Sequence, residues 1–398
     1  MEEPQDNAGS KGMAALASLL DRYATGSGRI TPRPRGSRLD SSVRATLEEA
    51  MALVEASPDE AAKAGRSLVY GNGCYAVGRH ADAVQVYLAI LEDEPFNADA
   101  RFNLGLAYLR LRSPEDAVRE FTDVLVREPF LAEAYYQRGN AHDDLGLVER
   151  ALDDYGRAIE LDPGYVQAMY NRAVVLGQAG RPQESVAQFD RVIAIRPDIS
   201  NAHLNRGASL DDMGLHDEAI DSYTRAVEIN PENSYAIFNR ARTNYYLGRL
   251  PEALADYSQV IEMTPDDAEA YNNRGLAYDA LGDYESAVSD FDSALALRPS
   301  FAEAHSNRGA VLEVQGDLDG ALAEYHRSLD ADPGMASAHY NAARVYSRTG
   351  DVSACLTHLD QVIELAPQLA EDAAHDEHLG WALKLREMRE VRGPEGEA

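Results

Sequence analysis

The sequence predicts an all-α fold of the α-solenoid class, built from nine 34-residue helix-turn-helix repeats. Prolines recur every 34 residues, small and aromatic residues recur at fixed positions between them, and one position of each repeat favours glycine. Such a period indicates stacked helix pairs, because one pair alone cannot bury its apolar face. The nine periodic prolines are Pro95, Pro129, Pro163, Pro197, Pro231, Pro265, Pro299, Pro333 and Pro367.

Two positions in each repeat predict close helix packing. With the proline set at position 32, the repeats run from 64 to 369, and position 8 is Gly or Ala in all nine. Position 24 is Tyr or Phe in eight repeats and Leu359 in the last. A small residue lets two helices approach, and the ring fills the space beside the contact.

The helix ends are also predicted. Position 15 is Gly in eight repeats, with Arg112 the exception, and a glycine there can end the first helix in a left-handed conformation. Proline at position 32 cannot continue the second helix and so begins the turn into the next repeat.

These residues resemble the tetratricopeptide repeat family, over nine repeats between 64 and 369. The resemblance implies a right-handed superhelix whose concave inner face is lined by the first helices and holds a peptide or a partner protein. It implies nothing about which partner.

The residues outside the repeats are expected to form caps and a linker. We expect 1–40 to be a flexible segment with a basic linker, 41–63 to be an N-terminal capping helix region, and 370–398 to be a C-terminal capping helix and tail. Terminal caps keep a solenoid soluble.

Composition excludes several classes of function. The net charge of −30 lies almost wholly after residue 63, which makes the body a poor ligand for nucleic acid. The sequence has two cysteines, lacks an apolar run long enough to span a membrane, and opens on an acidic end unlike a signal peptide. We therefore expect a cytoplasmic protein with neither membrane nor nucleic acid as a partner.

One face of the first helices carries a repeated amide. A helical wheel places positions 2, 5, 6, 9, 12 and 13 opposite the packed face, toward the expected groove. Position 6 is an amide in eight repeats: Asn103, Gln137, Asn171, Asn205, Asn239, Asn273, Asn307 and Asn341. A carboxamide both donates and accepts, so this amide ladder could hold an extended peptide backbone.

The amide ladder is similar to one in the repeats of O-linked N-acetylglucosamine transferase, which implies a grip on substrate backbone. The catalytic domain of that enzyme has no counterpart here. The alternative is that each amide ties neighbouring helices together, and the sequence favours neither role.

Rings and carboxylates share the groove face. The rings at position 5 include Tyr136, Tyr170 and Phe238, and the acids at positions 12 and 13 include Asp143, Asp144, Asp211, Asp212 and Asp279. Such a surface suits a basic or neutral, partly apolar peptide.

Arginine occupies position 7 on the packed face in six consecutive repeats, from Arg138 to Arg308. A buried guanidinium needs a partner, and position 23 offers Asp or Glu in four of those repeats. These arginines are predicted to form ion pairs between the two helices of a repeat, and not an anion-binding row.

The sequence predicts no enzyme, cofactor or metal site. The run from Gly71 to Ala76 matches a dinucleotide-binding pattern but lacks the preceding strand that the pattern requires. His375 and His378 have a spacing that could hold a metal, but we favour the interpretation that they are exposed residues of a capping helix.

We therefore expect an adaptor or scaffold that binds an extended peptide or partner protein in an acidic, asparagine-lined groove. The alternative is a non-catalytic subunit that docks a folded enzyme through its convex face or terminal helices. A further hypothesis places the basic run from Arg29 to Arg38 in the groove, opposite Asp143, Asp144, Asp211 and Asp212, as an internal competitor. Partner identity and oligomeric state are left open.

Overall fold

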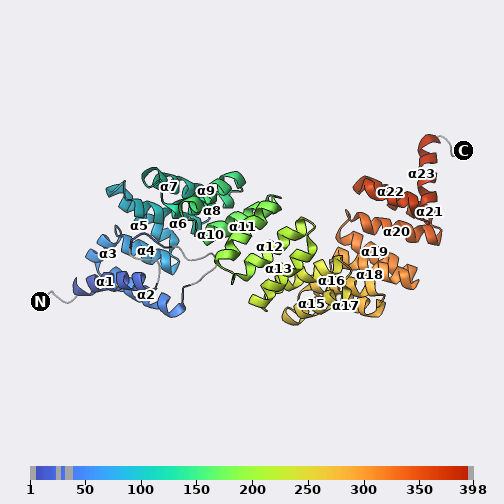
Figure 1. Ribbon diagram of the computed structural model, residues 1–398, viewed down its shortest axis with the longest axis horizontal. Coiled ribbons are helices and arrows are strands. Elements are labelled where there is room, and N and C mark those ends of the chain that lie inside the picture. The colour runs from blue at the N-terminus through green and yellow to red at the C-terminus, as the bar shows by residue number, and fades with distance from the viewer. Residues whose placement is uncertain (1–5, 24–27, 32–38, 393–398) are drawn as a thin grey trace. The chain divides into compact units, whose positions relative to one another are not determined.

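The computed structural model describes residues 6–23, 28–31 and 39–392, and every regular element among them is an α-helix (Figure 1). The chain divides into two compact bodies, residues 1–198 and 199–398. The all-α prediction is confirmed.

The N-terminal body contains two helices before the repeats, a short third one and four repeat pairs. Its helices are α1 (Asp6–Tyr23), α2 (Ser41–Glu55), α3 (Pro58–Ala64), α4 (Leu68–Val77), α5 (His80–Asp93), α6 (Ala98–Arg110), α7 (Pro114–Arg127), α8 (Ala132–Asp144), α9 (Val148–Leu161), α10 (Val166–Gln178) and α11 (Pro182–Ile195).

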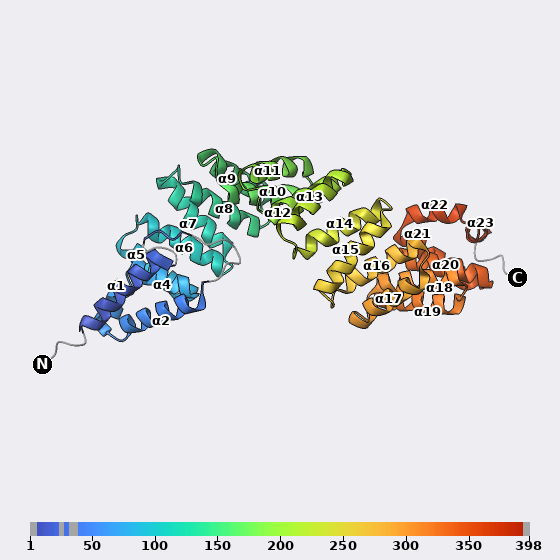
Figure 2. The same ribbon diagram turned by 60° about the horizontal axis from the view of Figure 1, so that its bottom comes forward.

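The C-terminal body contains five repeat pairs followed by two further helices. Its helices are α12 (Ser200–Asp212), α13 (His216–Ile229), α14 (Ser234–Tyr246), α15 (Leu250–Met263), α16 (Ala268–Leu281), α17 (Tyr284–Leu297), α18 (Ala302–Gln315), α19 (Leu318–Ala331), α20 (Ala336–Thr349), α21 (Val352–Leu365), α22 (Pro367–His375) and α23 (Gly380–Arg392). Consecutive helices from α12 to α21 pack against one another in the order of the chain (Figure 2).

The small residue at position 8 and the ring at position 24 pack as predicted. A β-carbon added to Gly207 would lie 2.6 Å from Cε1 of Tyr223, and one added to Gly105 would lie 2.8 Å from Cε1 of Phe121. Both rings are fully buried. At these two positions glycine therefore lets the ring pack closely against the first helix.

The turns inside the repeats adopt the predicted left-handed conformation. All eight glycines at position 15 have positive φ, from 70° at Gly146 to 89° at Gly78. Arg112 takes the same conformation, at φ 58°, as the one non-glycine residue with positive φ that the structure describes. The turn geometry is thus kept even where glycine is replaced.

Four of the six arginines at position 7 form the predicted ion pairs, in the repeats where position 23 is Asp or Glu. Nε and Nη2 of Arg240 both bond the carboxylate of Asp256 at 2.8 Å, and Nη1 donates to Thr224 Oγ1 of the preceding repeat at 3.1 Å. Arg138 and Arg274 pair with Asp154 and Asp290 in the same way. Arg308 contacts Glu324 through Nη1 alone, at 3.1 Å, and its Nε lies 3.0 Å from Asp292. Where Ser222 replaces the acid, Arg206 donates to its hydroxyl instead. Each of these arginines ties together the two helices of its own repeat.

Part of the N-terminal segment, which was expected to be flexible, is helical where the structure describes it. Residues Asp6–Tyr23 form α1, which packs against α2, α3 and α4. Leu16 and Leu20 are fully buried, and Leu16 lies against the backbone of Gly73 in α4. The short apolar stretch there covers the first repeat, because burying it removes two leucines and the open face of α4 from water together.

The end of the repeats is covered by α22 and α23. Leu379 and Ala382 are buried against Cys355 and Leu359 of α21. These two residues thus cover apolar side chains of the ninth repeat. No helix in the described part of the chain is long and apolar enough to cross a membrane.

Candidate peptide-binding groove

The chain places its own backbone on the groove face of repeats one and two. Asn103, in α6 at position 6, accepts a hydrogen bond from the N–H of Ile30 at 2.8 Å and donates one to the C=O of Gly28 at 3.0 Å. The two backbone groups flank Arg29, so the carboxamide spans one residue of the bound segment. This is the pairing expected of an amide that holds a peptide backbone.

A second amide completes the grip. Asn72, in α4 at position 9, donates to the same Gly28 carbonyl at 2.6 Å, and its own oxygen accepts from Asn103 at 2.9 Å. The hydroxyl of Tyr87 also donates to that oxygen at 2.8 Å. Tyr87 therefore fixes the orientation of Asn72, and Asn72 fixes that of Asn103. Sequence reasoning missed Asn72, whose signal is an asparagine at position 9 in a repeat with tyrosine at position 24.

The side chain of Arg29 lies in an acidic site. Its Nε donates to Asp99 at 2.7 Å, and its two terminal nitrogens donate to the two oxygens of Glu128 at 2.8 Å each. The guanidinium also lies 5.4 Å from the centre of the Phe102 ring. The hydrogen bonds to Glu128 raise the pKa of Arg29, and the same bonds lower the pKa of Glu128. The fork of two parallel hydrogen bonds makes this a strong and geometrically selective contact.

Ile30 lies in an apolar site. Only 2% of its surface is exposed, and it belongs to the hydrophobic cluster that also holds Leu20 and Phe102. Burying an isoleucine side chain contributes about 2 kcal/mol relative to leaving it in water.

These contacts differ from the hypothesis for the basic run in one respect. Arg29 was expected opposite Asp143, Asp144, Asp211 and Asp212, but its partners are Asp99 and Glu128. Arg33, Arg35 and Arg38 fall outside the described residues.

The rest of the amide ladder is used partly within the fold. Asn171 donates to Asn140 at 2.8 Å, and Asn307 donates to Asn272 at 3.0 Å, so these amides tie neighbouring first helices together. Gln137 donates to Glu133 at 2.7 Å. Both roles therefore occur: Asn103 bonds its neighbouring helix and the bound backbone at once.

The ladder amides differ in exposure. Asn103 and Gln137 are buried, whereas the asparagines of the later repeats keep part of their surface open to solvent. The half-buried members are Asn171, Asn205, Asn239, Asn273, Asn307 and Asn341.

The predicted rings at position 5 stand beside the position-24 rings of the core. Phe238 contacts Tyr257 edge to face, with ring centres 5.5 Å apart, and Tyr170 contacts Phe189 at 5.7 Å in the same arrangement. All three predicted rings, Tyr136 included, are half-buried, so one side packs on the core and part remains accessible.

The predicted carboxylates fall into two groups. Asp211 forms hydrogen bonds within the fold, because its Oδ2 accepts from Tyr223 at 2.8 Å and from Thr243 at 2.6 Å. Asp279 stands at the same position of repeat seven, where the ring is Phe291 and supplies no hydroxyl. Among the described residues Asp279 has no hydrogen-bonding or ionic partner, and burial raises its pKa. Asp144 and Asp212 are exposed, and Asp143 is half-buried.

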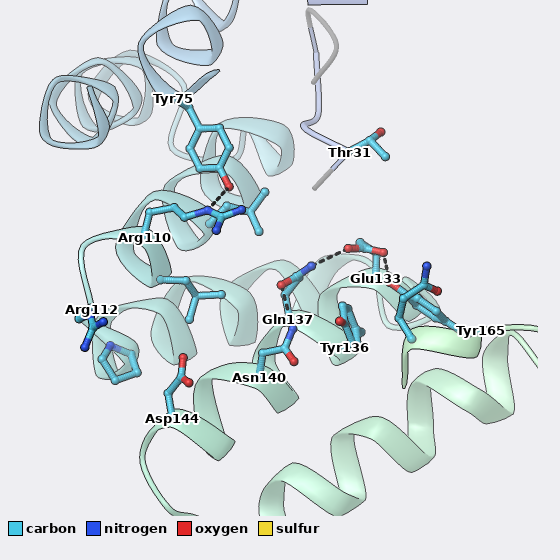
Figure 3. A pocket seen from close by; sticks show the side chains of 14 residues that line it. Thr31, Tyr75, Arg110, Arg112, Glu133, Tyr136, Gln137, Asn140, Asp144 and Tyr165 are labelled. Atoms are coloured by element: carbon cyan, nitrogen blue, oxygen red, sulfur yellow. Dashed lines mark hydrogen bonds between the residues drawn. The ribbon is translucent and has the colours of Figure 1, made fainter. Parts of the chain in front are cut away.

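A pocket of about 680 Å³ continues the path of the bound segment (Figure 3). Thr31 borders it on one side, and Tyr136, Gln137 and Asp144 of α8 line the other. Arg110 also lines it and donates to the hydroxyl of Tyr75 at 3.1 Å. Three residues predicted for the groove thus line a cavity in the N-terminal body.

The remaining candidate motifs are accounted for by packing. Gly71 lies against Tyr87, where an added β-carbon would be 2.6 Å from Cε1 of the ring. The dinucleotide-like pattern therefore coincides with a helix crossing. The described residues hold no group of three or more side chains arranged to bind a metal ion.

The helix pairs and the groove face define a helical repeat scaffold. Models of the tetratricopeptide repeat match residues 71–130, 132–165, 166–191, 200–233, 241–282, 274–336 and 314–375. The chain belongs to the tetratricopeptide repeat family, which serves as a scaffold for protein interaction. The matching models indicate no enzyme family.

Several solved structures are similar to parts of the chain. YrrB, described as a protein of this family with an unusual peptide-binding site, is 26% identical with a TM-score of 0.42, over 46% of this chain and 95% of that one. TTC0263 from Thermus thermophilus is 26% identical, with a TM-score of 0.40 over 46% and 98% of the two chains. MamA from Desulfovibrio magneticus is 24% identical, with a TM-score of 0.41 over 43% and 96%. A search of curated proteins found no match.

Proposed function

We propose that the chain is an adaptor that binds an extended polypeptide along the first-helix face of its repeats. The observation that carries this proposal is the pair of hydrogen bonds between Asn103 and the backbone of residues 28 and 30. Because the carboxamide contacts only backbone groups of the bound segment, the same contact is available at other positions of the amide ladder for partners of different sequence.

The chemistry of the face favours a basic or neutral, partly apolar partner. Asp279 offers a half-buried carboxylate without a partner among the described residues, and the half-buried rings of Tyr170 and Phe238 offer apolar contact. A net charge of −30 also favours a partner that carries positive charge. We propose that the protein binds its partner in the cytoplasm.

Removing ladder amides in the C-terminal body tests the proposal. Short random peptides are selected for binding to the full chain, and their affinities are measured by titration calorimetry before and after Asn205, Asn239 and Asn273 are all changed to Ala. Each lost amide pairing costs about 0.5–1.5 kcal/mol, so we expect binding to weaken at least about tenfold.

A matched control removes amides elsewhere. Gln259→Ala and Gln361→Ala delete half-buried amides from the second helices α15 and α21, off the groove face. This control should bind the peptides as the unchanged chain does. Equal affinities for the ladder variant and the control, or failure to select any peptide, would favour docking of a folded partner through the convex face instead.

A further inference from the structure

Repeats one and two form a sequence-selective site, and the chain's own residues 28–31 show what it selects. We infer that this site binds an extended peptide with an arginine followed by an aliphatic residue, and that Arg29 and Ile30 occupy it as a tethered internal ligand. The inference rests on the proposed function, because it uses the same backbone grip.

The backbone bonds set the register of the bound peptide. Asn103 contacts the carbonyl before Arg29 and the N–H after it, and Asn72 contacts the same carbonyl. The residue between these contacts, here Arg29, is therefore held in a fixed place, and the two backbone bonds orient its side chain. A peptide shifted by one residue would present a different side chain to the acidic site.

The acidic site selects arginine over other side chains. Asp99 and Glu128 come from the start of α6 and the end of α7, and together they bond three nitrogens of the guanidinium. Lysine carries one nitrogen and cannot make the parallel pair of bonds to Glu128. A neutral side chain would leave two neighbouring carboxylates without their cation, and the Arg29 side chain is only 24% exposed in the pair.

The neighbouring site selects an aliphatic residue. Ile30 is buried and belongs to the same hydrophobic cluster as Leu20 and Phe102, and its N–H is already bonded to Asn103. A charged residue here would be buried without a partner, which is strongly unfavourable. Arginine and the aliphatic residue that follows it therefore form a two-residue signature.

A partner must compete with a tethered ligand. Residues 28–31 lie between α1 and α2, and both helices pack against α4, so the segment is held close to its site. Tethers of this kind give effective concentrations of about a millimolar or more, so a free peptide with the same two residues loses to the internal one. A longer partner peptide can gain further contacts in the adjoining pocket, which Thr31, Tyr136 and Gln137 all line (Figure 3).

The probe for this inference is a fluorescent synthetic peptide with the sequence of residues 26–34, Gly-Ser-Gly-Arg-Ile-Thr-Pro-Arg-Pro. Its binding is measured by fluorescence anisotropy to the full chain and to the Arg29→Ala variant, which keeps α1 and Ile30 in place. Deletion of 1–40 is unsuitable, because it removes the buried Leu16 and Leu20. Circular dichroism checks that each variant is folded.

The inference predicts three results. The Arg29→Ala chain should bind the peptide at least about tenfold more tightly than the unchanged chain, because the internal ligand is weakened. Peptides with Lys in place of Arg, or Asp in place of Ile, should bind the variant about tenfold or more weakly. Adding Glu128→Gln to the Arg29→Ala chain should weaken binding of the peptide that carries arginine. It should not weaken binding of a peptide with alanine in place of that arginine. This difference would assign the lost affinity to the contact between the peptide arginine and Glu128.

Two outcomes would overturn the inference. Equal binding of peptides with and without the two residues would show a grip without selection, which leaves the proposed function intact. Absence of peptide binding to every variant would show that residues 28–31 are a structural strap only. The proposed function is then judged separately, by the ladder variants of the C-terminal body.

Discussion

Two tyrosines at the same position of different repeats should respond in opposite ways to loss of the hydroxyl. Tyr223 and Tyr257 both stand at position 24 and are fully buried. The hydroxyl of Tyr223 donates to Asp211 at 2.8 Å, whereas that of Tyr257 has no hydrogen-bond partner among the described residues. The reason is local: the neighbouring groove positions of repeat six hold Arg242 and Tyr245, where other repeats supply an amide or a carboxylate.

The magnitudes follow from these contacts. Tyr223→Phe removes a hydrogen bond to a carboxylate and should cost about 1.5–3 kcal/mol of unfolding free energy. Tyr257→Phe removes an unsatisfied buried hydroxyl, whose burial costs about 1–3 kcal/mol, and should leave stability unchanged or raise it by about 1 kcal/mol. The two variants should therefore differ by roughly 1.5–4 kcal/mol, although the chemical change is the same.

Urea unfolding followed by circular dichroism gives the overall change. Hydrogen exchange in α13 and α15 reads the two repeats separately, because a repeat array need not unfold in one step. Equal destabilisation by the two substitutions would refute this reasoning, because it would show that the hydrogen bond from Tyr223 to Asp211 does not decide the effect of losing the hydroxyl.

Three other perturbations test the packing and the charges. Gly207→Leu should lower the free energy of unfolding in urea by more than about 3 kcal/mol, because even a β-carbon would lie 2.6 Å from Tyr223. Asn205→Ala should lower it by about 1 kcal/mol or less. Similar losses for the two variants would show that the amide ladder has a structural role. Arg240→Ala should cost about 3 kcal/mol by stranding the buried carboxylate of Asp256, and the double alanine variant should cost less, which a double-mutant cycle measures. Burial lowers the pKa of His358 to about 4, so the unfolded chain binds more protons below pH 6.5, and stability should fall from pH 6.5 to 4. The loss should be about 1–2 kcal/mol for this half-buried ring, and unfolding of the His358→Phe variant across that range should lack it.

The repeat architecture could be predicted because it depends on local rules that recur nine times. Three of these rules each have a single physical cause: glycine adopts the left-handed conformation at the turn, proline ends a helix, and a small residue makes room for a ring. The ion pairs of four position-7 arginines could be predicted from the cost of burying a charge without a partner; these are Arg138, Arg240, Arg274 and Arg308.

The groove contacts could be predicted only in part. The face and Asn103 followed from helical periodicity, but Asp99 and Glu128 as partners of Arg29 depend on where the N-terminal segment enters the groove. No periodic pattern records that path. Asp211 was predicted as a groove acid because position 12 faces that side, yet its use by Tyr223 and Thr243 requires the three-dimensional arrangement of two repeats.

The central claim is that a ladder amide grips a peptide backbone, and the amide of Ile30 reports on it directly. Its N–H donates to Asn103 and to nothing else that the structure describes, so hydrogen exchange at Ile30, measured by nuclear magnetic resonance, follows that one bond. The unchanged chain should protect Ile30 from exchange, and Asn103→Ala should abolish the protection while the amides of α6 and α7 stay protected. Unchanged protection of Ile30 in the Asn103→Ala chain would contradict the account.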